Sequence, residues 1–543
     1  MTDTTVETDA TARTETVEGD LGRVELSTLP LPAHVRPESA TYTFTGSVFV
    51  LYRTDDDPVG QDWFHAAIVA DDGSDFREIF SGPIPRKPSA NGVRHMPFTD
   101  NRRVLLGDHV LEAAPDLDSA TSTELVDVEY PWGLDSDPLT SHHWSEIIVS
   151  PDGERIAWTA LRTDMTAIVA LGELRRDADR YTIADPVIIS SADMLTADPG
   201  RDGYYTARAM LGGEVKQFVR GGSAISSVGD GGGPLTDSVV QDLTADRIET
   251  LTRAPGYDET TILSPDERLG IVMTSRASHG TDPVFLGLVP RPHAKLVTAQ
   301  LAWVVYLYVV DGVRRFRPGN VGPVLVDLER SATDPDYVGT PLLGADDSWV
   351  YVSPMSWHPG GARTMWMEMV RGSGGEAERT LRIRLAELLD HTPGEPVATV
   401  PTPAAPPYAI GGDEARTIIG RTADTVPTGR IAGAHSGHLE FERSSDGRGN
   451  SSALSRYVDY SDDGLSFYNG EESFHGSMLG GVVYEADLEV TGATSGEMRL
   501  RAEWSGVQEG TRLLFGSGED GEQRSRGFAR YGGRTVRIED LVE

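Results

Sequence analysis

The sequence predicts an all-β protein: a β-propeller of six or seven blades, followed by an antiparallel β-sandwich domain. Two observations lead to this fold class. Short apolar segments of strand length recur through most of the chain, and turns rich in Pro, Asp and Gly separate them. The 59 glycines and 33 prolines suit many short strands joined by tight turns, and no long helical period interrupts the pattern.

Four regions follow one another along the chain. They are a disordered acidic tail (1–36), the propeller (37–391), a Pro-rich linker or strap across the propeller (392–428), and the C-terminal sandwich domain (429–543). The tail is rich in Thr, Asp and Glu and poor in apolar residues, which favours disorder. In the last region, residues 482–490 and 496–504 alternate apolar and charged side chains, as strands with one buried face do.

A recurring hairpin marks the propeller. Its clearest copy is Ser150-Pro151-Asp152-Gly153, which lies between two apolar strands. Related copies span 261–273, 355–366 and, in degenerate form, 95–106. Pro presets φ for the turn, and Asp and Gly close it. One such turn would say little, but several copies between short strands are typical of propeller blades and resemble TolB-type repeats.

Composition excludes several classes of function. The chain has 543 residues, more than the roughly 100–200 residues of one ordinary core. Its formal net charge of −36 would repel nucleic acid and anionic membranes, so neither is expected as a partner. The absence of cysteine excludes disulfides and thiol catalysis. Schiff-base chemistry has few candidates, since the only lysines are Lys87, Lys216 and Lys295.

The N-terminal residues 1–29 show neither the basic nor the apolar segment of a signal peptide. We therefore expect a cytoplasmic protein, unless a leader has been removed. The longest apolar run, 296–310, is short for a bilayer span and is expected to form a buried strand pair or a core helix. The oligomeric state is left open.

Common catalytic motifs are absent from the sequence. It contains no G-x-S-x-G nucleophile elbow, no H-E-x-x-H or C-x-x-C zinc motif, and no nucleotide-binding glycine loop. The acidic stretches 71–75 and 462–464 could each hold calcium, although acidic hairpin turns are the commoner explanation. No metal and no organic cofactor is therefore predicted.

Three segments resemble the fungal saponin hydrolases. They are 251–257 leading into Ser264-Pro265-Asp266 and 271–276, then 313–316, and finally 457–473. They occur in the same order and span both domains. The resemblance implies a secreted-type glycosidase, a β-glucuronidase in effect, that releases glucuronic acid or another sugar from a terpenoid or other bulky glycoside. The chain departs from that family by lacking a leader and cysteines, which leaves the natural substrate and compartment open.

Glycoside hydrolysis usually needs two carboxyl groups, about 5–5.5 Å apart for retention and about 6.5–9.5 Å apart for inversion. In a propeller, residues just before each innermost strand gather around one mouth of the central channel. Glu146, Asp258 and Glu259 occupy such positions and are the predicted catalytic acid and base. The alternative is that they cap turns or pair with arginines of neighbouring blades.

A second set of residues is predicted to bind the sugar. It comprises His95, His142, His143, Trp144, Arg276, Arg314, Arg315 and His358. Aromatic faces stack on sugar rings, histidines donate to hydroxyls, and arginine binds a carboxylate through two hydrogen bonds. Packed loop residues and structural ion pairs remain the alternatives. For Glu471 and Glu472 a hairpin role is favoured over a place at the channel mouth.

Two rival functions stay open. A non-enzymatic propeller that binds a protein or glycan partner would show a broad exposed apolar or aromatic rim in place of clustered carboxylates. A metal-dependent lyase or lactonase on the same scaffold would hold a metal in the channel through Asp, Glu or His.

Overall fold

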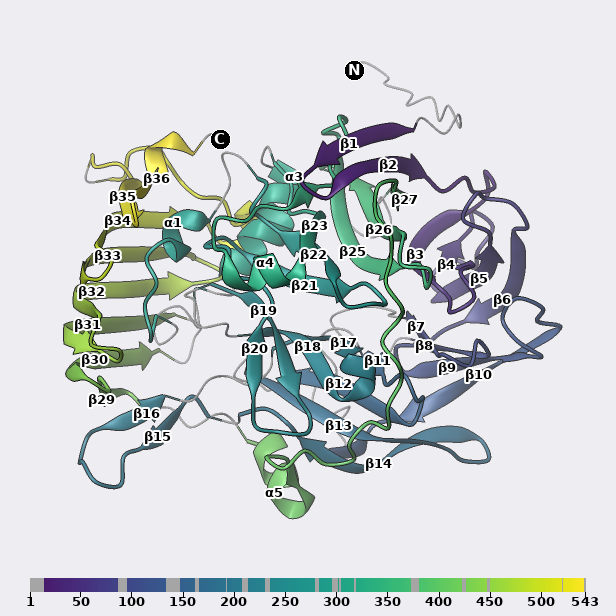
Figure 1. Ribbon diagram of the computed structural model, residues 1–543, viewed down its shortest axis with the longest axis horizontal. Coiled ribbons are helices and arrows are strands. Elements are labelled where there is room, and N and C mark those ends of the chain that lie inside the picture. The colour runs from purple at the N-terminus through teal and green to yellow at the C-terminus, as the bar shows by residue number, and fades with distance from the viewer. Residues whose placement is uncertain are drawn as a thin grey trace.

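The protein is described by a computed structural model. The described residues are 14–541, except 86–94, 133–146, 162–165, 192, 208–212, 230–234, 279–282, 295–300, 302–303, 317–318, 373–379, 422–425, 447–449 and 520. Strands dominate these residues. Short sheets occupy one side of the molecule, and one broad C-terminal sheet stands on the other (Figure 1).

The short sheets, which we call blades, are arranged so that their first strands form a ring. In the described residues each first strand contacts the next, in the order β3, β7, β11, β17, β21, β25, and β25 contacts β3 again. The first three blades are β3 (Arg36–Tyr42), β4 (Val48–Arg53), β5 (Trp63–Val69), β6 (Arg77–Pro83); β7 (His95–Pro97), β8 (Arg103–Leu106), β9 (His109–Ala114), β10 (Ser122–Glu129); and β11 (Ile147–Val149), β12 (Arg155–Leu161), β13 (Ala167–Arg176), β14 (Arg180–Ile188). The next three are β17 (Val215–Val219), β18 (Ala224–Gly229), β19 (Asp237–Asp242), β20 (Ile248–Thr250); β21 (Asp258–Leu263), β22 (Leu269–Thr274), β23 (Val324–Asp327), β24 (Thr340–Pro341); and β25 (Trp349–Trp357), β26 (Arg363–Val370), β27 (Leu381–Leu388).

The four predicted hairpins are all present, as β7–β8, β11–β12, β21–β22 and β25–β26. In the β11–β12 and β21–β22 hairpins, Ser and Asp side chains close the turns. Ser264 Oγ donates to Asp266 Oδ1 at 2.6 Å and accepts from the Leu269 amide at 3.0 Å. Ser150 Oγ accepts from the Arg155 amide at 2.9 Å in the same way. The side chains thus satisfy backbone groups that a tight turn would otherwise leave unpaired.

The N-terminal region differs from the expected disordered tail. Residues 15–28 form β1 (Glu15–Gly19) and β2 (Gly22–Thr28), and β2 pairs antiparallel with β27. Val24 and Leu26 are fully buried by this pairing. Their alternation with polar residues gives the strand one apolar face, which the acidic composition of the whole N-terminal region conceals. The expectation of disorder was therefore wrong for these residues, and 1–13 lie outside the described ranges.

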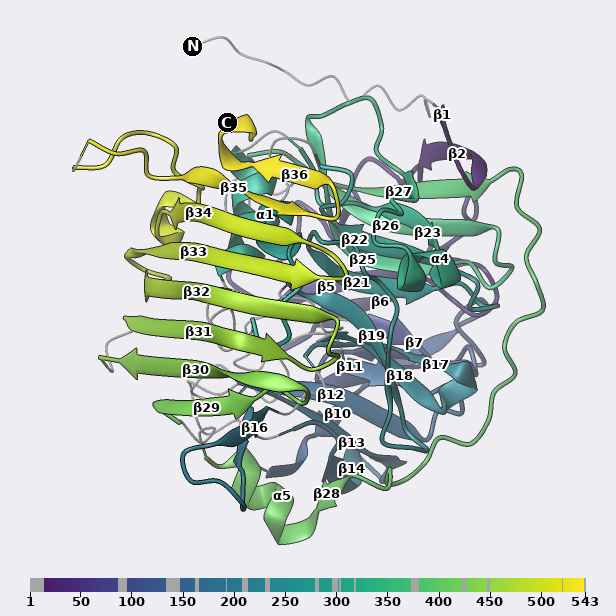
Figure 2. The same cartoon turned by 60° about the vertical axis from the view of Figure 1, so that its left-hand side comes forward.

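The Pro-rich region after β27 is extended and crosses three blades, as the long trace at one edge of Figure 2 shows. The Val397 amide donates to Pro265 O at 2.8 Å, and the Val400 amide donates to Gly221 O at 2.9 Å. The Thr402 amide donates to Asp152 Oδ2, also at 2.8 Å. These contacts make the segment 394–402 a strap over the hairpin turns of the β21, β17 and β11 blades.

The contact between the strap and Gly221 yields a prediction about stability. A Cβ at Gly221 would lie 2.1 Å from Ala398 O, whereas a Cβ at Gly203 would meet nothing within 4 Å, and φ is similar at the two positions (68° and 72°). Both alanine variants bear the left-handed strain, but only Gly221→Ala pushes on the strap. We expect Gly221→Ala to lower the free energy of unfolding by about 1–3 kcal/mol more than Gly203→Ala does. Urea denaturation of the full chain measures the difference, and equal midpoints would contradict the strap contact.

The C-terminal region forms one antiparallel sheet whose strands follow in chain order (Figure 2). Its strands are β29 (Thr428–Ala432), β30 (Ser436–Ser445), β31 (Ser451–Ser461), β32 (Ser466–Ser477), β33 (Gly481–Gly492), β34 (Gly496–Trp504), β35 (Arg526–Tyr531) and β36 (Arg534–Arg537). The predicted sandwich of two sheets differs from this single sheet. Alternation correctly indicated one buried face, but a helical insertion from the β21 blade covers that face instead of a second sheet.

The insertion lies between β22 and β23 and contains α1 (Val284–Gly287), η3 (Tyr308–Val313, a π-helical turn) and α3 (Arg314–Phe316). Phe285 stacks on Trp504 of the C-terminal sheet, with ring centroids 6.4 Å apart. The described part of the apolar run, 301 and 304–310, is helical and mostly buried, which agrees with the predicted core helix and not with a strand pair. None of the helices in the described ranges has both the length and the apolar character needed to cross a membrane.

The remaining elements are short. They are β15 (Leu195–Ala197), β16 (Tyr205–Ala207), β28 (Ile410–Gly411), α4 (Leu328–Thr333), α5 (Gly412–Ile419) and the 3-10 turns η2 (Arg220–Gly222), η5 (Val507–Glu509) and η6 (Ile538–Asp540). β28 pairs with β14, which also pairs in parallel with β10 and so joins two blades into one sheet.

Candidate active site

A cluster of ionisable side chains lies where three neighbouring first strands begin. Lys216 is the second residue of β17, Glu259 is the second of β21, and Tyr351 is the third of β25. The cluster also contains Glu214, just before β17, and Tyr306 and Arg314 from the helical insertion. We call these six residues the Lys216 cluster.

One ammonium group joins two carboxylates in this cluster. Lys216 Nζ donates to Glu214 Oε2 at 2.7 Å and lies 3.6 Å from Glu259 Oε1. These two distances place the two oxygens no more than roughly 6 Å apart, which is closer than the separation of about 6.5–9.5 Å found in inverting glycosidases. The Lys216 side chain is only 3 % exposed, against 10 % for Glu259 and 18 % for Glu214. The pair is therefore largely shielded from water, with Glu214 on the more open side.

Three tyrosines surround the two carboxylates. Tyr257 donates its hydroxyl to Glu259 Oε2 at 2.8 Å, and burial, followed by the charge of Glu259, raises the pKa of Tyr257 well above its usual value. Burial also raises the pKa of Tyr306, with further contributions from Glu259 and Glu214. The pKa of Tyr351 rises to about 12, chiefly through burial. All three phenols therefore stay protonated at neutral pH and can act as hydrogen-bond donors.

Arg314 supplies a second cation at the same place. Its guanidinium carbon lies 5.6 Å from the centroid of the Tyr351 ring, within cation–π range. Its Nε is buried and has no hydrogen-bond partner in the described part of the chain. Burial raises the pKa of Tyr306 and of Tyr351, and the nearby positive charge of Arg314 offsets part of that rise. An anionic ligand group could occupy this position and satisfy the unpaired donor.

Asp258 and Arg276 are brought together with each other, away from this cluster. Arg276 Nη2 donates to Asp258 Oδ2, and the side chains are 4 % and 0 % exposed. Arg276 also donates to the Tyr337 carbonyl at 3.1 Å. Successive residues of a strand point to opposite faces, so the side chains of Asp258 and Glu259 lie in different surroundings. The ion-pair alternative describes Asp258 and Arg276 better than the predicted catalytic and sugar-binding roles do.

Three further predicted residues lie apart from the cluster. His95 begins β7, three blades from β21 around the ring, and its Nδ1 is 2.9 Å from Ser39 Oγ. His358 follows the last residue of β25, so it lies on the order of 20 Å along the strand from Tyr351. Arg315 forms an ion pair with Asp311 at 2.7 Å and is one-third exposed. Glu146, His142, His143 and Trp144 lie outside the described residues.

Sequence reasoning missed Glu214, Lys216, Tyr306 and Tyr351. The β17 blade was overlooked because its first turn is Arg220-Gly221-Gly222-Ser223, with none of the Ser-Pro-Asp letters of the other copies. One signal was present: Lys216 is among only three lysines, and it interrupts an otherwise strand-like segment directly after Glu214. Tyr306 was hidden inside the apolar run of the insertion.

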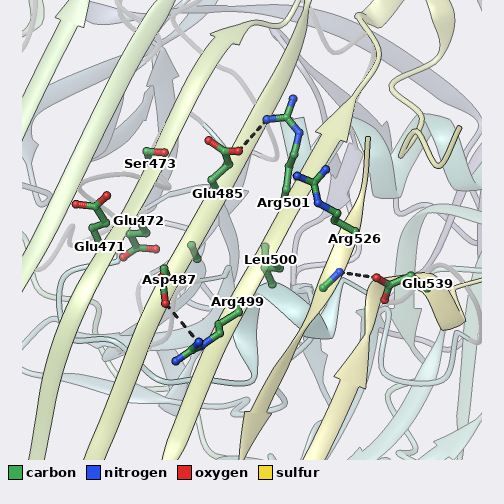
Figure 3. A pocket seen from close by; sticks show the side chains of 12 residues that line it. Glu471, Glu472, Ser473, Glu485, Asp487, Arg499, Leu500, Arg501, Arg526 and Glu539 are labelled. Atoms are coloured by element: carbon green, nitrogen blue, oxygen red, sulfur yellow. Dashed lines mark hydrogen bonds and ion pairs between the residues drawn. The ribbon is translucent and has the colours of Figure 1, made fainter. Parts of the chain in front are cut away.

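A surface depression of about 500 Å³ lies on the solvent face of the C-terminal sheet (Figure 3). Its charged lining is mutually paired: Arg501 lies 2.8 Å from Glu485, and Arg499 lies 3.7 Å from Asp487. Such cross-strand pairs are the ordinary way to stabilise an exposed sheet face. The unpaired donor and the bridged carboxylates are found in the Lys216 cluster instead. Across the described ranges, no three His, Asp or Glu side chains gather in a way that could hold a metal ion.

Comparison with known proteins gives similarity at the level of fold. No family model matches the sequence, and no curated protein matches it. Among solved structures, a candidate TolB from Agrobacterium tumefaciens is 14 % identical over 60 % of this chain and 84 % of that one, with a TM-score of 0.31. A candidate 6-phosphogluconolactonase from Bacteroides uniformis is 11 % identical over 70 % and 95 %, with a TM-score of 0.29. An alpha-L-arabinofuranosidase from Fusarium graminearum is 10 % identical over 65 % and 93 %, with a TM-score of 0.31.

These similar structures are of the propeller type and include hydrolases. None of the three is a saponin hydrolase, so that resemblance stays a prediction. At such identities and TM-scores the likeness carries no inference about chemistry. Function must therefore be argued from the residues of the Lys216 cluster.

Proposed function

We propose that this chain is a glycoside hydrolase on a six-bladed, TolB-like propeller, with the Lys216 cluster as its active site. The observation that carries the proposal is the pair of carboxylates, Glu214 and Glu259, held no more than roughly 6 Å apart by one buried ammonium. That separation lies below the range of about 6.5–9.5 Å that leaves room for an attacking water, so it favours a retaining mechanism.

The surroundings of the two carboxylates divide their roles. Glu259 is the more buried, and the Tyr257 hydroxyl holds one of its oxygens as an acceptor, which suits an oriented nucleophile. Glu214 is more exposed and can exchange protons with water, which suits the general acid and base. Lys216 contacts both carboxylates and would have to shift aside as the sugar enters between them.

The substrate we propose is a glycoside whose sugar carries a carboxylate, such as a glucuronide with a terpenoid or other bulky aglycone. Arg314 supports this choice because its buried Nε lacks a partner and its charge faces the cluster. A guanidinium recognises a carboxylate through two parallel hydrogen bonds. The aromatic ring of Tyr306, which is only partly buried, would offer a face on which a sugar ring can stack.

Sugar release from nitrophenyl glucuronide, nitrophenyl glucoside and a soyasaponin tests the proposal. We expect the wild type to prefer the glucuronides. Arg314→Lys should lower kcat/KM for nitrophenyl glucuronide by about tenfold or more and leave the glucoside nearly unchanged, because lysine cannot reproduce the bidentate contact.

Arg315→Lys is the matched control, since Arg315 pairs with Asp311 toward solvent, and it should change neither rate. A folded wild-type protein that releases no sugar from any of these substrates would reject the glycosidase. A glucuronide preference that survives in Arg314→Lys would keep the glycosidase and remove Arg314 from the binding site.

A further inference from the structure

A buried ion pair fastens the helical insertion to the C-terminal sheet. Arg291 of the insertion and Glu472 of β32 both have side chains with 0 % exposure. Arg291 Nε donates to the two Glu472 oxygens at 3.1 and 3.3 Å. The other end of the guanidinium donates to the insertion itself, at Val289 O (2.6 Å) and Leu286 O (3.2 Å). The Arg291 side chain thus links the backbone of the insertion to a carboxylate of the sheet and fixes their relative position.

The Glu472 carboxylate is itself fixed. The Tyr484 hydroxyl of β33 donates to Glu472 Oε2 at 2.7 Å. Burial raises the pKa of Tyr484 well above its usual value, so this hydroxyl stays protonated at neutral pH and remains a donor. The charge of Glu472 helps to raise the pKa of Arg291, although burial opposes it. A pair of this kind is directional, unlike the apolar packing around it.

The same insertion ends at the candidate active site. About twenty residues after Arg291 it carries Tyr306 and Arg314 into the Lys216 cluster. Its last turn also touches the C-terminal region closely, because a Cβ at Gly312 would lie 2.9 Å from the carbonyl oxygens of both Gly510 and Thr511. The segment that bears Arg314 therefore also lies against the C-terminal region.

We propose that Glu472 is a positioning residue, which acts through Arg291 to hold the insertion so that Arg314 and Tyr306 face the carboxylate pair. This inference rests on the proposed function for its catalytic consequence. The C-terminal sheet then serves as the support of the active site, and an interaction far along the chain sets the affinity for the sugar carboxylate.

The neighbouring residue provides a matched control. Glu471 also lies on β32, but its side chain is half exposed and pairs with Arg456 at 2.9 Å on the solvent face. Glu471→Gln and Glu472→Gln therefore make the same chemical change one residue apart. Only Glu472→Gln leaves the Arg291 charge buried without its partner.

The experiment combines two measurements on the full chain. Amide hydrogen exchange in 304–316 should become about tenfold faster in Glu472→Gln and stay unchanged in Glu471→Gln, because the segment loses its tether. In the same variant the preference for nitrophenyl glucuronide over nitrophenyl glucoside should fall by about tenfold, mainly through a rise in KM for the glucuronide.

If Glu472→Gln does not fold, the double variant Arg291→Gln with Glu472→Gln removes both charges, keeps a hydrogen-bonding group at each position, and takes its place in both measurements. Wild-type exchange in 304–316 together with an unchanged substrate preference in a folded variant would overturn the positioning role. A wild type that releases no sugar would instead reject the proposed function, and the exchange measurement would still decide whether Glu472 holds the segment.

Discussion

Replacing Glu259 with glutamine should lower kcat/KM for nitrophenyl glucuronide by a factor of about 10²–10⁴. Glutamine keeps the shape of the side chain, and its amide oxygen can still accept the hydrogen bond from Tyr257. It removes the negative charge, so the side chain can no longer attack the anomeric carbon or stabilise positive charge there. Initial rates over a range of substrate concentrations, on protein whose fold is verified by circular dichroism, measure the effect.

Glu249→Gln is a suitable control, since Glu249 pairs with Arg220 on the surface of the β17 blade and is 40 % exposed. Its activity should stay near that of the wild type. Activity in Glu259→Gln within threefold of the wild type would remove Glu259 from the mechanism.

Azide distinguishes the roles of the two carboxylates. In Glu259→Ala, azide would attack the substrate directly and give a product of inverted configuration, because only one displacement occurs. In Glu214→Ala, azide would attack a glycosyl-enzyme already formed on Glu259, and two displacements restore the configuration. The opposite pattern would exchange the two roles that the burial of Glu259 and the exposure of Glu214 suggest.

Local sequence signals were enough to locate the first hairpin of four blades. The Ser-Pro-Asp turns work as signals because their side chains form hydrogen bonds with the turn backbone, as Ser264 and Asp266 do. These hydrogen bonds involve only residues that are close together in the sequence. Alternation in 482–490 and 496–504 likewise identified β33 and β34. Both signals act within a few residues, so they need no knowledge of the rest of the chain.

The features that sequence reasoning missed depend on distant partners. β2 is short and lies in an acidic region, and it joins a sheet by pairing with β27, some 360 residues later, as well as with β1. The buried face of the C-terminal sheet was evident from alternation, but the identity of what covers it was not. Context of this kind decides strand formation more than intrinsic propensity does.

The candidate site was predicted only in part for the same reason. Glu259 and Arg314 come from segments identified in the sequence, and the structure brings them to one cluster. Lys216 and Tyr306 join them from a blade with an atypical turn and from an insertion, and no local pattern links those segments. The adjacent residue Asp258 was predicted to share the role of Glu259, although strand geometry turns it toward Arg276.

Asp258→Asn should lower the free energy of unfolding by about 3–5 kcal/mol, because it breaks a buried ion pair. The cause is the Arg276 guanidinium, whose side chain is 4 % exposed and would lose its only charged partner among the described residues. Glu249→Gln breaks an exposed ion pair in the neighbouring β17 blade and should lower the free energy of unfolding by no more than about 1 kcal/mol. Urea denaturation of the two variants and the wild type gives the comparison.

Activity at low temperature separates the structural role of Asp258 from a catalytic one. Molecules of Asp258→Asn that remain folded should keep kcat close to the wild-type value, because Asp258 contacts Arg276 and has no exposed surface to offer a sugar. The double variant Asp258→Leu with Arg276→Met should recover much of the lost stability, since it leaves no buried charge behind. A folded Asp258→Asn protein with normal stability and abolished turnover would contradict this account. Asp258 would then be a member of the catalytic pair, and its pairing with Arg276 would have to open during the reaction.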